Sequence, residues 1–122
     1  MLLQIEERQI EPGITVLELT GRFALGRESQ RLETIADGLV QAGRTRAILD
    51  LTGVNYLDSA GIGLIALAAG KLKEARGKMV AVAPEGRVLE MLKMTQVNRI
   101  VTVCPTVPEA VSALGEIPPA VA

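Results

Sequence analysis

The chain has 122 residues, about the length of one domain, and 48% of them are hydrophobic, which is enough apolar material for a core. Its formal net charge is −1 and its aromatic content is 2%. This composition excludes both the basic surface that follows a phosphate backbone and the aromatic platform that stacks bases, so we expect no nucleic-acid partner.

Side chains for catalysis and metal binding are scarce. Histidine is absent, which removes the commonest general base and the imidazole metal ligand. The single cysteine, Cys104, excludes an internal disulfide and fits a reducing cytoplasm. No stretch reaches the roughly 18 apolar residues of a membrane span, and the first residues lack the basic start of a signal peptide. We therefore expect a cytoplasmic protein that does not insert into a membrane and is not an enzyme.

The first residues predict an antiparallel hairpin. Leu2–Ile10 mixes apolar and polar residues as a half-exposed edge strand does, and the apolar, β-branched run Ile14–Thr20 predicts its partner. Between them, Glu11–Gly13 has the proline and glycine of a turn. We expect Gly21 to end the second strand.

The middle of the chain alternates between helical and strand patterns. Apolar residues at helical spacing predict a helix over residues 27–42, with Gly43 at its C′ position. Ala47–Leu51 predicts a short buried strand, and Thr52–Asp58 a loop. A second helix then opens at Asp58 or Ser59 and continues over residues 59–76, where Gly77 is expected to stop it.

The last third predicts two strands and two helices. The apolar run Met79–Ala83 is a strand, a short helix follows Pro84, and Ile100–Val103 is the last strand. Thr106 and Glu109 form a capping box for a final helix. The order ββαβαβαβα predicts a mostly parallel sheet of about five strands, with an antiparallel N-terminal edge strand and about four helices. We expect one domain over residues 1–116 and a tail over residues 117–122.

The stretch Ile48–Ile65 is where chemistry is expected. A buried strand leads to Asp58 and Ser59 at the start of a helix, and sites in open α/β sheets gather at the carboxyl ends of strands. The free N–H groups of a helix N-terminus favour an anion, so Ser59 is placed to carry a phosphate. Gly61 and Gly63 cost about 1 kcal/mol each in helix propensity, and they offer bare backbone that a partner can approach.

Other interpretations of these residues stay open. Serine is a favoured N-cap, so Ser59 can be explained by capping alone. A hydrolase nucleophile would need a base, and no histidine exists. Asp50 fits a strand-end or loop-fixing residue better than a catalytic acid, and Cys104 fits a small packed hydrophobe. Met91 and Met94 fit core or groove fillers, or adaptable contacts on the surface.

Two segments around Ser59 carry a family resemblance. They are Ile48-Leu-Asp-Leu-Thr-Gly-Val and Leu57-Asp-Ser-Ala-Gly-Ile-Gly, and the strand Met79–Ala83, the helix around Leu89 and the start of the last helix follow in matching order. The whole chain thus resembles a STAS domain of the bacterial anti-sigma factor antagonist family. In that family the serine after the aspartate is the phosphoacceptor, which the resemblance assigns to Ser59.

The resemblance implies a partner-switching regulator. The unphosphorylated protein would bind an anti-sigma factor that is also a serine kinase, and so release the sigma factor. Phosphorylation of Ser59 would break the complex, and a PP2C-type phosphatase would reset it. ATP would belong to the kinase, so this chain would need no cofactor and no metal, and it would be a monomer or weak dimer. The implied partner-binding residues are Asp58, Ser59, Ala60, Gly61 and Gly63.

One departure from the family pattern favours an alternative. The family often has Gly-x-(Leu/Phe/Ile)-Asp after its second strand, whereas this chain has Gly21-Arg-Phe-Ala24 and lacks the acid. Because that acid lies near the phosphosite in relatives, its loss bears on recognition by a kinase. The alternative is a constitutive STAS subunit of another complex, such as a lipid ABC transporter ATPase, without phosphorylation.

Overall fold

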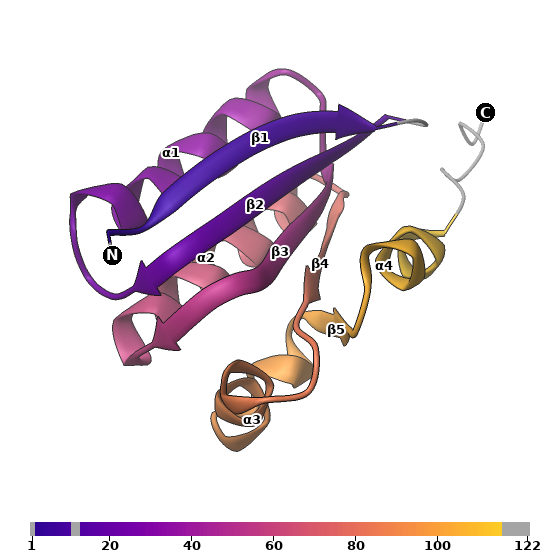
Figure 1. Cartoon of the computed structure of the whole chain (residues 1–122). Coiled ribbons are helices and arrows are strands. Elements are labelled where there is room, and N and C mark those ends of the chain that lie inside the picture. The colour runs from indigo at the N-terminus through magenta and orange to yellow at the C-terminus, as the bar shows by residue number, and fades with distance from the viewer. Residues whose placement is uncertain (1, 11–12, 116–122) are drawn as a thin grey trace.

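The computed structural model describes residues 2–10 and 13–115, which form a five-stranded sheet and four α-helices (Figure 1). The strand order is β1-β2-β3-β4-β5, in which β1 and β2 pair antiparallel and all other neighbours pair parallel. The predicted α/β class and the antiparallel edge strand are therefore confirmed. The elements are β1 (Gln4–Ile10), β2 (Ile14–Phe23), α1 (Arg27–Gln41), β3 (Arg46–Leu57), α2 (Ser59–Glu74), β4 (Lys78–Val82), α3 (Arg87–Met94), a 3₁₀ helix (Val97–Arg99), β5 (Thr102–Cys104) and α4 (Val107–Leu114).

Two parts of the predicted fold lie partly or wholly outside the described residues. Of the predicted turn, Glu11 and Pro12 lie outside the described residues, and Gly13 has a positive φ of 70°. The predicted tail over residues 117–122 also lies outside the described residues.

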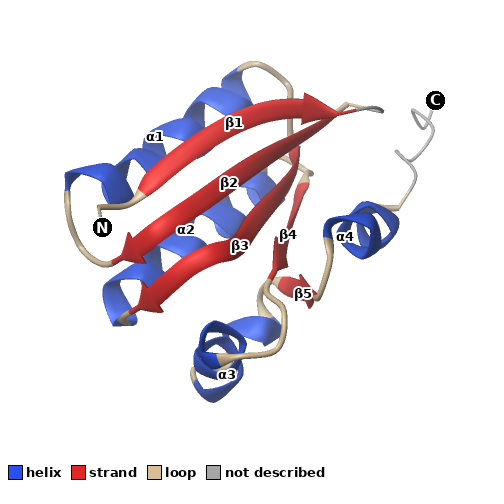
Figure 2. Cartoon of the chain, viewed as in Figure 1, coloured by secondary structure: helices blue, strands red, loops and turns tan. Residues whose placement is uncertain are grey.

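Helices cover the two faces of the sheet unequally (Figure 2). The larger core lies between the sheet and α1, α2 and α3, and α4 alone packs on the other face. Successive strand residues point to opposite faces, so Ile48 belongs to the α4 side and Leu49 to the larger core. Because both faces are buried there, the central strand appears in the sequence as one continuous apolar run.

β2 continues past the glycine that was expected to end it. Gly21 lies within the strand at a φ of 97°, next to a shift in the pairing register with β3. Phe23 extends the strand and is fully buried. A glycine in a strand interior thus marks an irregularity in pairing here, and the prediction of a strand end was wrong.

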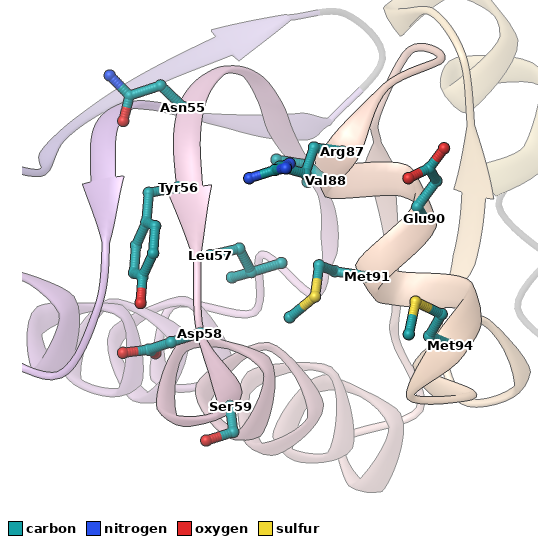
Figure 3. Close-up of a pocket in the computed structure, with 10 residues that line it drawn as sticks. All are labelled: Asn55, Tyr56, Leu57, Asp58, Ser59, Arg87, Val88, Glu90, Met91 and Met94. Carbon is teal, nitrogen blue, oxygen red and sulfur yellow. The ribbon is translucent and has the colours of Figure 1, made fainter.

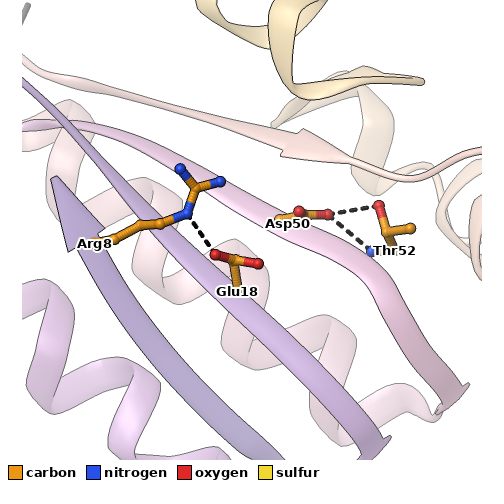
Figure 4. Close-up of polar contacts among 4 residues, drawn as sticks. All are labelled: Arg8, Glu18, Asp50 and Thr52. Atoms are coloured by element: carbon orange, nitrogen blue, oxygen red, sulfur yellow. Dashed lines mark hydrogen bonds and ion pairs between the residues drawn. The ribbon is translucent and has the colours of Figure 1, made fainter. Parts of the chain in front are cut away.

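β3 includes the segment predicted as a loop, so that prediction was also wrong. The strand continues to Leu57 because Val54 and Leu57 are buried and this half pairs with the end of β2. One oxygen of the Asp50 carboxylate accepts hydrogen bonds from the N–H and the hydroxyl of Thr52, at 3.0 and 2.6 Å (Figure 4). These bonds lie where β3 has one residue more than β2, so Asp50 fixes a bulge instead of a strand end.

The predicted ends of the later elements are partly confirmed. Gly43 has the positive φ of 71° expected after α1, and the Thr106 hydroxyl accepts the N–H of Glu109 at 3.3 Å as a cap of α4. After α2, however, Arg76 and not Gly77 adopts the left-handed conformation. A Cβ on Gly77 would lie 2.1 Å from a backbone oxygen of the loop before β3, so close packing explains this glycine. The last strand starts at Thr102, later than predicted, because the N–H groups of Ile100 and Val101 close the turn after a 3₁₀ helix by donating to the carbonyl of Val97.

Candidate functional site

Helix α2 is capped by Asp58. Its carboxylate accepts the N–H of Gly61 at 2.9 Å, and its backbone is extended with a φ of −114°. Ser59 is therefore the first residue inside the helix, and the interpretation of Ser59 as the N-cap was wrong. The Ser59 hydroxyl is consequently not needed to satisfy the N–H groups at the helix start.

Ser59 itself is exposed at the start of the helix, as predicted. Within the part of the chain that the structure describes, no group hydrogen-bonds its hydroxyl. The positive end of the helix dipole lies at this position and stabilises a negative charge placed there. The hydroxyl is thus accessible for modification, and its environment suits an anion.

The small residues after Ser59 differ in their surroundings. Ala60 is half-buried, and Gly61 is buried against the ends of β2 and β3. A Cβ on Gly61 would lie 2.7 Å from the carbonyl oxygen of Phe23 and 2.8 Å from Cδ1 of Leu57. Gly63 is exposed, with no atom within 4 Å of such a Cβ. The expectation of accessible bare backbone was therefore wrong for Gly61 and fits Gly63.

Ala24 lies next to this helix start. The carbonyl oxygen of Phe23 accepts the N–H of Asp58 at 3.4 Å, and Ala24 directly follows and is half-buried. An acid at position 24 would thus have added a second carboxylate beside the one of Asp58. The adjacent Leu25 is 67% exposed.

A pocket of about 500 Å³ opens beside Ser59, between the end of β3 and α3 (Figure 3). It exists because β3 is longer than β4, which pairs with β3 only as far as Asp50. Leu57 and Met91 face one another across its floor, and Ser59 lies at the rim (Figure 3). The lining residues are Asn55, Tyr56, Leu57, Asp58, Ser59, Arg87, Val88, Glu90, Met91 and Met94.

No pattern in the sequence indicates this pocket, because its walls come from separate segments of the chain. Met94 is 78% exposed and Met91 is half-buried, so of the two interpretations of this pair, adaptable surface contact fits Met94 better than core packing. Tyr56, which was assigned to a loop, forms a wall of the pocket, and the Arg22 guanidinium lies 3.8 Å from the centre of its ring. This cation–π contact holds a half-exposed aromatic ring beside the helix start.

Within residues 2–10 and 13–115, cysteine, aspartate and glutamate form no group of three or more that could hold a metal ion. Over the same residues, no helix combines the length and the apolar character needed to cross a bilayer.

Comparisons with known proteins agree on the fold. The family model of the STAS domain matches residues 7–110. An anti-sigma factor antagonist from Mycobacterium paratuberculosis has a similar structure, with a TM-score of 0.80 and 20% identity over 94% of this chain and 96% of that one. The Bacillus cell fate determinant SpoIIAA in its phosphorylated form gives a TM-score of 0.70 and 15% identity over 91% and 99%. The murine anion transporter Slc26a9 gives 0.67 and 20% over 87% of this chain and 18% of that one.

Proposed function

Because the chain belongs to the STAS domain family, we propose that it is an anti-sigma factor antagonist in which Ser59 is a phosphorylation switch. The unphosphorylated protein binds an anti-sigma factor with serine kinase activity and so releases the sigma factor. Phosphorylation of Ser59 breaks this complex, and a PP2C-type phosphatase restores the binding form. The protein acts in the cytoplasm as a regulator without catalysis or a cofactor of its own.

The observation that carries this proposal is the position of Ser59. It is an exposed serine at a helix N-terminus whose cap is supplied by Asp58, so the hydroxyl is available to a kinase. The antagonist from Mycobacterium paratuberculosis and the phosphorylated form of SpoIIAA share the fold and support the assignment. Ala60 and Gly63 add little side-chain bulk beside Ser59, which leaves room for a partner on this helix face.

Phosphorylation is expected to act on binding and not on folding. A phosphoserine carries about −1.5 to −2 charge at neutral pH, and an exposed helix N-terminus stabilises such a charge by only about 0.3–1 kcal/mol. Burying an unpaired ion in an interface costs several kcal/mol, and each 1.4 kcal/mol is a tenfold loss of affinity. A loss of roughly 100-fold in affinity is therefore expected while the melting temperature stays nearly unchanged.

A second function is favoured by Ala24. Without the acid at this position, the chain can act as a constitutive STAS subunit of another complex, such as a lipid ABC transporter ATPase, with Ser59 unmodified. The match to the murine anion transporter, of which this chain corresponds to 18%, fits a STAS module built into a larger machine. In that case the same helix face contacts a permanent partner.

The test is a binding experiment with an anti-sigma factor kinase encoded in the same genome. Affinity is measured by calorimetry for the unmodified protein, for the protein after incubation with ATP and the kinase, and for Ser59→Ala and Ser59→Asp. Ser112→Asp, which places the same charge at an exposed serine of α4, is the matched control. We expect phosphorylation and Ser59→Asp to weaken binding, and Ser59→Ala and Ser112→Asp to leave it unchanged. Equal affinity of the phosphorylated and unphosphorylated forms would support the constitutive subunit.

A further inference from the structure

The pocket beside Ser59 has a chemical character of its own. Its volume of about 500 Å³ lies within the range of about 300–1,000 Å³ that is typical of ligand pockets. Leu57, Val88 and Met91 give it an apolar floor, and Met94 extends from the rim with 78% of its surface exposed. Methionine side chains are flexible and fit apolar groups of different shapes. The pocket therefore has ample room for a large apolar side chain.

Three charged residues line this pocket, one cation, Arg87, and two anions, Asp58 and Glu90. The Asp58 carboxylate keeps its charge but is held at the start of α2, where it accepts the N–H of Gly61. Glu90 points away from the apolar floor, whereas the Arg87 guanidinium lies on the side of the floor (Figure 3). Among residues 2–10 and 13–115, Arg87 has no ion-pair partner. A guanidinium in this position pairs most strongly with a carboxylate.

We propose that the pocket receives one large apolar side chain of a partner protein, and that a carboxylate next to this side chain pairs with Arg87. The inference deepens the proposed function and rests on it for the choice of a protein as the occupant, because Ser59 lies at the pocket rim. A phosphoserine at this rim would repel the same carboxylate of the partner. The switch and the anchor would thus act on one segment of the partner.

The experiment uses a displayed library of random dodecapeptides, selected on the immobilised unphosphorylated protein. Enriched peptides are synthesised and their affinities measured for the wild type, Arg87→Glu and Met94→Ser. Arg99→Glu is the matched control, because Arg99 is also exposed and unpaired within the described residues but lies outside the pocket. Thermal melts check that all four proteins are folded.

We expect the enriched peptides to share a large apolar residue within two positions of an aspartate or glutamate. Arg87→Glu should weaken their binding about tenfold or more, since charged hydrogen-bonded pairs contribute at this level, and Met94→Ser should also weaken it. Arg99→Glu should have no effect. Replacing the peptide's carboxylate by lysine should restore binding to Arg87→Glu.

Three results would overturn the inference. They are peptides without a shared acid, affinities that Arg87→Glu and Met94→Ser leave unchanged, and the enrichment of no peptide at all. Decanoate, a small apolar acid, is tested alongside, and binding as tight as that of the best peptide would assign the pocket to a small molecule instead. None of these results involves a kinase, so failure here is distinguishable from failure of the phosphorylation experiment.

Discussion

Replacing Gly61 by alanine should destabilise the protein, although alanine is the better helix former. The change adds about 1 kcal/mol of helix propensity. The new Cβ, however, would lie 2.7 Å from the carbonyl oxygen of Phe23 and 2.8 Å from Cδ1 of Leu57. The leucine methyl can rotate away, but the carbonyl belongs to the strand backbone and accepts the N–H of Asp58. Overpacking of this kind costs about 1–3 kcal/mol, so the net loss should be up to about 2 kcal/mol.

Gly63→Ala is the matched control for this prediction. Gly63 lies two residues further in the same helix, and its added Cβ would meet no atom within 4 Å. This variant should gain about 0.5–1 kcal/mol, because only the helix propensity changes. The effect of alanine on the unfolded chain is similar in both variants, so their difference isolates the contact with β2.

Urea denaturation followed by circular dichroism measures both variants. We expect the midpoint of Gly61→Ala to fall below that of the wild type and the midpoint of Gly63→Ala to rise above it, with unchanged slopes. For a domain of this size, 1 kcal/mol corresponds to roughly 4 °C in melting temperature. Equal stability of Gly61→Ala and Gly63→Ala would refute the prediction, because it would mean that the close approach of α2 to β2 does not constrain this position.

Three further predictions concern other residues. Asp58→Ala should lower the free energy of unfolding by about 1 kcal/mol in urea denaturation, because the cap of α2 is lost, and Asp58→Asn should retain most of it; no difference between the two would contradict the capping role. The hydrogen bond to Asp37 raises the pKa of Lys71, so its contribution to stability is present below the ordinary lysine pKa and is lost as the pH rises through the raised value. Lys71→Met should therefore remove part of the alkaline decline in the urea midpoint, and an identical decline in both proteins would contradict this. Burial, assisted by the charge of Glu109, raises the pKa of the Cys104 thiol, so iodoacetamide should label it more slowly in the native protein than in urea, whereas equal rates would refute the assignment.

Short sequence patterns correctly predicted those features that a few neighbouring residues determine. The continuous apolar run around Ile48 predicted a strand buried on both faces, and Thr106 predicted the cap of α4. Asp58 and Ser59 were both acceptable caps, and only the hydrogen bond to Gly61 distinguishes them. The exposure of Ser59 followed from its place after a buried strand.

Features that depend on a neighbouring strand could not be predicted. Thr52 and Gly53 have the composition of a loop, yet they continue β3 because β2 provides backbone partners beyond Asp50. The pocket depends on the different lengths of β3 and β4, which no local pattern encodes. The role of Gly61 depends on Phe23, a residue 38 positions earlier in the chain.

The different lengths of β3 and β4 give the sheet an additional open border. β4 accompanies β3 only to Asp50, so the half of β3 that ends at Leu57 has β2 on one side and no described strand on the other. The unpaired N–H and C=O groups of a strand edge can pair with a strand of another chain. Here α3, which is anchored by the buried Leu92, lies beside this edge. This short helix therefore shields the middle of the sheet in addition to forming a pocket wall. Detachment of α3 would therefore expose both a strand edge on which neighbouring molecules can pair and the part of the core that Leu92 fills.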